Sequence, residues 1–328
     1  MLRLGIVGCG RVARTHIERI LALPDVEVVA CMDLDANAAH SLAGLLGGAQ
    51  PGRGVATFTD HRALLASVQP DAVAIFTPHP AHFRPAADAL QAGCHVFIEK
   101  PLSTNVQEAH DLVRLARSRG RKLGVGHQYR LRSSLIEARA RIRSGAIGPL
   151  RLVTATLAAP WLAAHATDAD AWRYEPRRGG GILYDVGDHL LDALLWTTGQ
   201  VAQGVAAFQH RLPSGLDLVT AATIRLADGT LVLLGLSALA AGSLFEIVYH
   251  AERATLRVSD VTLSETSADG ETKVIDLPVA AETIDGNFVA AVRDEGPLCC
   301  SAEEALDTVR LLEAIGRSAS SNQFAPVA

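Results

Sequence analysis

A carboxylate and an imidazole stand four residues apart in the middle of the 328-residue chain, soon after three consecutive glycines. Asp185 and His189 open an apolar stretch that reaches Trp196, and the leucines of this stretch are spaced to cover one face of a helix. Residues four apart on a helix project side by side. Because an imidazole and a carboxylate held together can handle a proton near neutral pH, the pair is a candidate for acid–base chemistry. The glycines at 179–181 would let the backbone turn tightly beside a ligand.

A second candidate site lies at the start of the chain. Leu2–Val7 is a short apolar run, the residues after it have the spacing G-x-G-x-x-A, and a helix-like stretch follows to about residue 23. The first glycine of such a turn permits the sharp bend, and the second lets the main chain approach a diphosphate. The N–H groups at the start of the helix then bind the phosphates. We therefore expect a dinucleotide at this turn, in contact with Gly8, Gly10, Arg11 and Val12.

Asp33 follows the second predicted strand, 26–32, roughly 25 residues after Gly8, where an acidic residue bonds the ribose hydroxyls of adenosine. A carboxylate at this point repels a 2′-phosphate, so Asp33 favours NAD over NADP. A solvated aspartate at the end of a strand is the alternative interpretation. Arg11 sits within the glycine turn and leaves room for NADP.

Strands and helices alternate as far as residue 126, which predicts a parallel, doubly wound sheet. Gly8, Asp33, Thr77 and Lys100 all follow predicted strands, and ligands of such sheets bind at the carboxyl ends of the strands. Lys100 comes directly after the apolar run 94–98 and Glu99. Its ammonium could stabilise a developing alkoxide. A surface pair between Lys100 and Glu99 is the alternative.

The pattern changes after residue 126. A series of alternating strands follows, including 217–226 and 230–239 joined by an Ala-Asp-Gly turn, and this predicts a mostly antiparallel sheet. We expect a Rossmann domain at 1–126 and an α+β domain at 127–328. One face of a large sheet left uncovered by helices often forms a subunit interface, so we predict a homodimer or homotetramer through the second sheet.

Composition excludes several classes of function. The chain is 49% hydrophobic and 20% charged, and its formal net charge of −5 gives no electrostatic footprint for nucleic acid or an anionic membrane. No apolar run reaches the length that spans a bilayer. The five cysteines are odd in number and form no C-x-x-C pair, so we expect reduced thiols and a cytoplasmic protein.

Taken together, the motifs resemble the oxidoreductases grouped with glucose–fructose oxidoreductase, inositol dehydrogenase and the rhizopine-catabolism proteins, the Gfo/Idh/MocA family. The residues that carry the resemblance are the turn 8–13, Thr77-Pro78 with His82, Glu99-Lys100-Pro101, and the stretch 179–192. The resemblance implies a Rossmann domain followed by an open-sheet domain, a nicotinamide cofactor, and sugar or polyol substrates. It adds Thr77, Pro78, His82, Glu99 and Lys100 to the expected cofactor site, and it implies the catalytic set Lys100, Asp185 and His189.

The sequence hypothesis is reversible hydride transfer between a secondary alcohol and nicotinamide. His189 would take the hydroxyl proton, Lys100 would steady the alkoxide, and Asp185 would orient His189 and bond a neighbouring hydroxyl. Trp172 and Arg173 precede the glycines and are expected to line the substrate pocket, where Asp185 and His189 also contact the substrate.

Several alternatives stay open. His189 could be a hydrogen-bonded core histidine, and Trp172 could belong to the core. Asp185, His189 and Asp192 could be metal ligands, although we expect no metal, because zinc sites rarely use this set without a further His or Cys. Arg177 and Arg178 could grip an anionic substrate or lie in a solvated loop. Two other functions are a glycosidase that cycles its bound NAD and a non-catalytic nucleotide sensor.

Overall fold

The computed structural model describes residues 1–49, 54–165, 172–176, 179–279 and 282–327, which divide into two compact units. Met1–His127 and Glu282–Leu306 form the first unit, and Gln128–Ala281 and Asp307–Ala328 form the second. The expected boundary at 126–127 lies one residue from the end of the first segment. The expected second domain, 127–328, also includes residues 282–306, and these belong to the first unit in the structure.

The first unit is built on a six-stranded sheet in the order β3-β2-β1-β4-β5-β6, and every neighbouring pair of strands is parallel. Its strands are β1 (Leu2–Val7), β2 (Val26–Met32), β3 (Ala56–Phe58), β4 (Ala72–Ile75), β5 (His95–Ile98) and β6 (Leu123–Val125). The helices between them are α1 (Arg11–Leu21), α2 (Ala36–Ala49), α3 (His61–Val68), η1 (His79–Ala81), α4 (Phe83–Gln91) and α5 (Val106–Arg119). All four residues of β4 are buried, as expected of a parallel strand covered on both faces. The predicted doubly wound sheet is confirmed.

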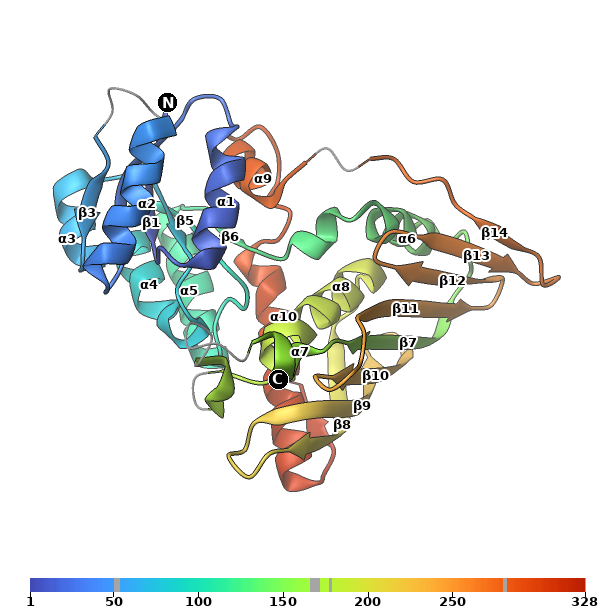
Figure 1. The fold of residues 1–328 in the computed structure, drawn as a ribbon. Coiled ribbons are helices and arrows are strands. Elements are labelled where there is room, and N and C mark those ends of the chain that lie inside the picture. Colours follow the sequence, from blue (N-terminus) through green and yellow to red (C-terminus); the bar gives the residue numbers. More distant parts are fainter. Residues whose placement is uncertain (50–53, 166–171, 177–178, 280–281, 328) are drawn as a thin grey trace. The chain divides into compact units, whose positions relative to one another are not determined.

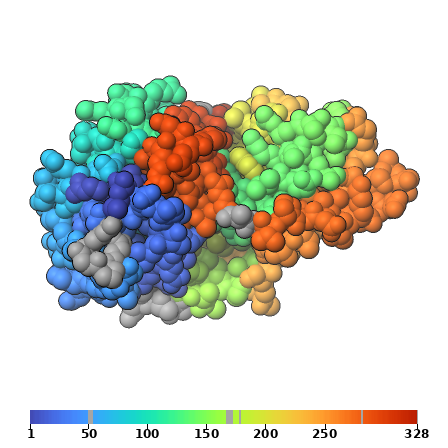
Figure 2. Space-filling model, turned by 90° about the horizontal axis from the view of Figure 1, so that it is seen from above, coloured from blue at the N-terminus to red at the C-terminus, as the bar shows by residue number. Residues whose placement is uncertain are grey.

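Helix α9 (Ile284–Val292) returns the chain to this unit and lies beside α1. In Figure 2 the orange atoms of this segment lie against the blue atoms of the N-terminal elements. The Thr283 hydroxyl caps the helix by accepting a hydrogen bond from the Gly286 N–H at 3.0 Å. Asp285, in the first turn of α9, thereby gains a fixed position next to α1.

The second unit holds a nine-stranded sheet in the order β14-β13-β12-β11-β7-β10-β9-β8-β15 (Figure 1). The strands are β7 (Leu150–Ala158), β8 (Ala202–Arg211), β9 (Asp217–Leu226), β10 (Leu231–Ser237), β11 (Leu244–Ala251), β12 (Ala254–Ser259), β13 (Leu263–Ser267), β14 (Thr272–Val274) and β15 (Ala325–Pro326). Strands β7 and β10 are parallel, and the other neighbouring pairs are antiparallel. The helical elements are η2 (Gln128–Leu131), α6 (Ser133–Arg143), α7 (Trp161–Ala164), η5 (Leu183–Gly187), α8 (Asp188–Thr198) and α10 (Ala302–Ser321), which begins in the first unit. The predicted mostly antiparallel sheet is confirmed.

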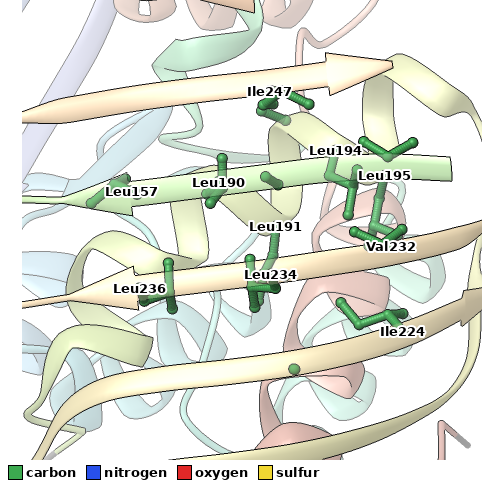
Figure 3. Close-up of a cluster of buried hydrophobic side chains, with 14 of the residues drawn as sticks. Leu157, Leu190, Leu191, Leu194, Leu195, Ile224, Val232, Leu234, Leu236 and Ile247 are labelled. Carbon is green, nitrogen blue, oxygen red and sulfur yellow. The ribbon is translucent and has the colours of Figure 1, made fainter. Parts of the chain in front are cut away.

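One face of this sheet carries the core of the second unit. Side chains alternate along β9 and β10, so every second residue points inward. Figure 3 shows the leucines of α8 lying over the inward side chains of β7, β9, β10 and β11, among them Leu157, Ile224, Leu234 and Ile247. The residues between them, such as Leu231 and Leu233 of β10, face the other way and are exposed. Helix α8 is therefore held by its apolar face, and this fixes the direction of its first turn.

Two general expectations can be compared with the structure. Every helix within the described residues is too short or too polar to cross a membrane. All five cysteines are free thiols.

Candidate active site

The glycine turn after β1 has the geometry that a diphosphate requires. Gly8 has φ +91°, and a Cβ at this position would lie 2.7 Å from the carbonyl carbon of Phe76. Only glycine therefore lets the turn lie this close to the end of β4. At Gly10, by contrast, an added Cβ would meet no atom of the described residues within 4 Å. Gly10 directly precedes α1, whose N-terminus has no side-chain cap, so the space beside Gly10 borders main-chain N–H donors.

Asp33 and Thr77 stand beside this turn at the ends of β2 and β4. The Asp33 carboxylate accepts a hydrogen bond from the Cys9 N–H at 2.8 Å, which ties the end of β2 to the turn. The hydroxyl oxygen of Thr77 is buried and has no hydrogen-bond partner within the described part of the chain. A buried hydroxyl in this position is available to a bound molecule. Together with the open space at Gly10, it fits a dinucleotide cofactor.

Arg11 is exposed at the first position of α1, and Val12 after it is half-buried. Both belong to the predicted glycine turn. Their assignment to the cofactor site stays a prediction.

His82 is placed differently from the other predicted cofactor residues. It is fully buried, and its ring nitrogens lie 2.8 Å from the carbonyl oxygens of Pro101 and Thr77. Burial lowers the pKa of His82, despite the opposing effect of these two hydrogen bonds. The imidazole therefore joins the loop after β4, where half-buried Pro78 lies, to the loop after β5. A direct contact between the His82 ring and a cofactor does not follow from this geometry, because both nitrogens already face backbone oxygens.

Glu99 and Lys100 follow β5 at the same edge of the sheet. The Glu99 carboxylate is buried and accepts a hydrogen bond from the Lys100 backbone N–H at 3.0 Å. Its other oxygen lies 3.0 Å from Nε2 of His16. The alternative of a solvated Glu99–Lys100 surface pair is therefore wrong for Glu99. Lys100 itself is half-buried and precedes a cis peptide bond to Pro101.

In the second unit, the glycine run leads into η5, a π-helical turn that contains Asp185. Gly181 has φ +105°, and a Cβ there would lie 1.9 Å from an oxygen of Asp217. The other oxygen of Asp217 accepts a hydrogen bond from the Leu183 N–H at 2.9 Å. Burial raises the pKa of Asp217. Asp217, which has no predicted role, thus anchors the turn that presents Asp185.

Asp185 lies in a buried polar cluster with two side chains from the segment before the glycines. Its Oδ2 accepts hydrogen bonds from Nε1 of Trp161 at 2.6 Å and from Nε of Arg173 at 3.1 Å. The guanidinium of Arg173 also stacks on Trp172, 4.3 Å from the ring centroid. The structure therefore brings together the predicted residues Trp172, Arg173 and Asp185. Arg177 and Arg178 lie outside the described residues.

His189 is buried in the first turn of α8, one turn after Asp185. Its ring stacks on Tyr129, with ring centroids 4.4 Å apart and planes 11° apart. The guanidinium of Arg132 lies 3.4 Å from the centroid of the same tyrosine ring. Two groups this close cannot occupy one face of the ring, so Arg132 and His189 lie on opposite faces of Tyr129.

Asp192, the third member of the alternative metal-ligand set, is engaged in an ion pair. Arg130 donates to it from Nε at 2.9 Å and from Nη2 at 2.7 Å, and both side chains are fully buried. A carboxylate held by a guanidinium in this two-point fashion has its negative charge compensated. The geometry around Asp192 therefore favours an ion pair that fixes α8 against η2.

A hollow of about 780 Å³ lies elsewhere in the first unit, bordered by residues of α3 and α4 and by the segments that precede β4 and β5. Because these segments enter the strands, the hollow lies at the amino ends of the strands. Ligands of parallel sheets bind at the opposite edge. No predicted site residue borders it, and we do not assign it a function.

Sequence reasoning missed several residues that surround the predicted residues in the two units. In the first unit these are His16, which contacts Glu99, and Asp285, which contacts His16. In the second unit they are Tyr129, Trp161 and Asp217. His16, Tyr129 and Trp161 contact the predicted residues Glu99, His189 and Asp185 directly, and the nearest of these pairs, Trp161 with Asp185, is 24 positions apart in the sequence. Local spacing carries no signal for such contacts.

Comparison with known proteins places both units in one family. The model of an oxidoreductase family with an NAD-binding Rossmann fold, GFO_IDH_MocA, matches residues 2–127. The model of the GFO/IDH/MocA C-terminal domain matches residues 135–257.

Two curated relatives are similar over part of their length. D-glucoside 3-dehydrogenase of Escherichia coli is 30% identical over 60% of this chain and 54% of the relative. A dTDP-3,4-didehydro-2,6-dideoxy-α-D-glucose 3-reductase of Streptomyces antibioticus is 34% identical over 64% of this chain and 61% of the relative. The matched region thus spans between about half and two thirds of these relatives.

Among solved structures, the WlbA dehydrogenase of Bordetella pertussis, in complex with NADH and UDP-GlcNAcA, is 25% identical. The match has a TM-score of 0.85 and covers 100% of this chain and 99% of the other. An aldose–aldose oxidoreductase of Caulobacter crescentus, at 19% identity and a TM-score of 0.86 over 99% of each chain, shows the same fold.

Proposed function

Because the chain belongs to the Gfo/Idh/MocA oxidoreductase family, we propose that it is an NAD(P)-dependent dehydrogenase of a sugar, polyol or related compound. The reaction moves a hydride between a secondary alcohol carbon and the nicotinamide ring. The observation that carries the proposal is the glycine turn: Gly8 is fixed against the end of β4, while the space at Gly10 stays open beside the start of α1. The relatives named above, which include a glucoside dehydrogenase and a nucleotide-sugar reductase, support a sugar-like substrate.

We assign NAD as the preferred cofactor. The Asp33 carboxylate stands at the end of β2 and is held toward the glycine turn by the Cys9 N–H. In this position it would accept hydrogen bonds from the adenosine ribose and repel a 2′-phosphate. Gly8, Gly10, Arg11, Val12 and Asp33 would hold the adenosine diphosphate part. Thr77, Pro78 and Lys100 would border the nicotinamide side.

The residue roles follow from chemistry and from the local geometry. When bound, NAD supplies the hydride acceptor. His189 takes the hydroxyl proton of the substrate, and the Tyr129 ring stacked on it keeps the imidazole in one orientation. Lys100 stabilises the alkoxide that forms as the proton leaves.

Asp185 orients His189 and accepts a hydrogen bond from a neighbouring substrate hydroxyl. Trp161 and Arg173 hold its carboxylate for this purpose. Trp172, stacked on Arg173, borders the same pocket.

The second sheet provides the subunit interface in this proposal. Phe208 is 69% exposed, and Leu231 and Leu233 are 44% and 47% exposed. These side chains share the face of the sheet that points away from the core, as the strand register shows. An exposed apolar patch on a sheet face is typical of an interface. A homodimer or homotetramer would cover it.

The test is turnover of NAD with a substrate panel of inositols, glucosides and nucleotide sugars, followed by absorbance of reduced nicotinamide. We expect at least one substrate to reduce NAD, and His189→Ala and Lys100→Ala to lose most of the activity. His110→Ala, an exposed histidine of α5, is the matched control and should keep it. Full activity in either active-site variant would remove that residue from its role.

The same assay separates the two alternatives. A glycosidase that cycles its bound NAD would release a free sugar with no net reduced nicotinamide. A nucleotide sensor would bind NADH and turn over none of the panel. Lys100 and His189 argue against a sensor, because nucleotide sensing needs neither.

A further inference from the structure

Four charged side chains form a cluster in the first unit; three of them are buried, and the fourth, Arg19, is partly exposed. His16 and Arg19 come from α1, Glu99 from the end of β5, and Asp285 from the first turn of α9. Nδ1 of His16 lies 2.6 Å from Asp285, and Nε2 lies 3.0 Å from Glu99. Arg19 forms an ion pair with Asp285 at 3.3 Å. The side chains of His16 and Asp285 are almost fully buried, so this is no solvated surface network.

The two contacts of His16 determine its charge. A carboxylate oxygen accepts hydrogen bonds, and a neutral imidazole has only one N–H to give. In the neutral form, the lone pair of the second nitrogen would face a carboxylate. Only the imidazolium donates to Asp285 and Glu99 at once. Two anions, Glu99 and Asp285, are then balanced by two cations, His16 and Arg19.

The proton affinity of His16 agrees with this geometry. Burial by itself lowers the pKa of the imidazole, but the hydrogen bonds to Asp285 and Glu99 outweigh burial and raise the pKa to about 9. The same contact, with His16 as donor, lowers the pKa of the Glu99 carboxyl below its usual value although burial acts in the opposite direction. His16 also stacks on Phe76, with ring centroids 4.6 Å apart, so its ring has little freedom to rotate.

The cluster reaches Lys100 through Glu99. The Glu99 oxygen that does not face His16 accepts the backbone N–H of Lys100 at 3.0 Å. Gly126 leaves the space that this carboxylate occupies, because a Cβ at Gly126 would lie 2.7 Å from Glu99. A chain of direct contacts therefore runs from Asp285 through His16 and Glu99 to the main chain of Lys100.

We propose that His16 is a positioning residue: as an imidazolium clamped by Asp285, it holds the Glu99 carboxylate against the Lys100 amide and so fixes where the Lys100 ammonium acts. The proposal rests on the role of Lys100 in the proposed function. Helix α1 would then serve two functions. Its first turn borders the proposed cofactor site, and His16 in its middle supports Lys100 through Glu99. Misplacing a catalytic group by about 1 Å can cost up to about a hundredfold in rate.

The experiment combines His16→Gln and Asp285→Asn with Lys100→Met in a double-mutant cycle. His61→Gln is the matched control, because His61 also bonds a carboxylate of the first unit, Asp88 at 2.8 Å, but lies outside the cluster. We expect His16→Gln to lower kcat at least about tenfold, while the Kd of NADH changes by less than about threefold. Asp285→Asn should act in the same direction, and His61→Gln should change neither quantity.

The Lys100→Met background decides whether His16 acts through Lys100. In that background, adding His16→Gln should change the residual kcat by less than about twofold. An equal fold loss of kcat in both backgrounds would overturn the positioning role. Wild-type kcat in His16→Gln, together with an impaired Lys100→Met, would also overturn it and leave the proposed function intact. Full activity of Lys100→Met itself would remove Lys100 from its role in the proposed function, and with it the basis of the positioning role.

A measurement on the wild-type protein tests the charge of His16 even if the variants fail to fold. Nitrogen NMR of protein with labelled histidine reports whether each ring nitrogen carries a proton. For His16, identified by the signal that disappears in His16→Gln or by sequential assignment, we expect both nitrogens to be protonated at pH 7.5. A singly protonated ring would refute the imidazolium clamp.

Discussion

Changing Gly8 or Gly10 to alanine should have opposite effects on stability and on cofactor binding. At Gly8, φ is +91° and a Cβ would lie 2.7–2.9 Å from three main-chain atoms of Phe76 and Thr77. Main-chain atoms cannot rotate away, so backbone strain and overpacking together should cost about 2–5 kcal/mol of stability. At Gly10, φ is −74° and the space is open, so Gly10→Ala should change the stability by less than about 1 kcal/mol.

For cofactor binding, the change at Gly10 is the one expected to have a large effect. The methyl group of Gly10→Ala fills the space that the diphosphate would enter, and we expect the Kd of NADH to rise at least about tenfold, or about 1.4 kcal/mol. Urea unfolding measures the stability, and fluorescence titration of the folded protein measures the affinity. Wild-type affinity in Gly10→Ala would refute a diphosphate at this turn. Wild-type stability in Gly8→Ala would refute the close approach of the turn to β4.

Three further outcomes are expected. Asp33→Ser should reduce the preference for NAD over NADP at least about tenfold in kcat/KM, because it removes the carboxylate that repels a 2′-phosphate; an unchanged ratio would contradict the assignment. The pKa of His16 is raised from 6.5 to about 9, so its stabilisation is complete below pH 6.5 and is lost as the pH rises to about 9. Between pH 6.5 and about 9, the free energy of unfolding of the wild-type protein should fall by about 3 kcal/mol relative to that of His16→Gln. If the two proteins lost stability equally over this pH range, the raised pKa of His16 would be contradicted. Leu233→Asp should dissociate the oligomer in sedimentation velocity, whereas Leu45→Asp, on exposed surface of the first unit, should not; an oligomer that persists in Leu233→Asp would exclude this face of the sheet.

The regular elements could be read from the sequence because their signal is local. The strand predicted at 217–226 has the observed bounds, since alternation of apolar and polar residues has the period of a half-buried strand. The hairpin between β9 and β10 is also confirmed. The parallel pairing of β7 with β10 was not predicted, because alternation does not specify the neighbour of a strand or its direction.

The assignment of 282–306 to the first unit was beyond sequence reasoning for a related cause. The pattern of α9 marks an apolar face, but it does not say which sheet the face covers. The turn that carries Asp185 was predicted as ordinary helix. Over the five residues of η5, the apolar pattern does not distinguish a π-helical turn from an α-helical one.

The candidate site was predictable as a set of residues and not as a set of contacts. Motifs pointed to Asp185, His189, Glu99 and Lys100. The side chains of Trp161, Tyr129 and His16, which contact the first three of these, come from distant segments. The family resemblance also assigned His82 to the cofactor site, whereas both of its ring nitrogens lie next to backbone oxygens. A residue can thus stand within a functional motif because it shapes the loop that carries the chemistry.

Buried carboxylates near the predicted residues are paired with cations in each of the two units. In the first unit, Glu99 and Asp285 are balanced by His16 and Arg19. In the second, Asp185 is paired with Arg173 and Asp192 with Arg130. An uncompensated buried charge is costly, so a buried carboxylate needs a cationic partner nearby. Each of these four carboxylates has that partner within its own unit, so the geometry around it is fixed by contacts inside one unit.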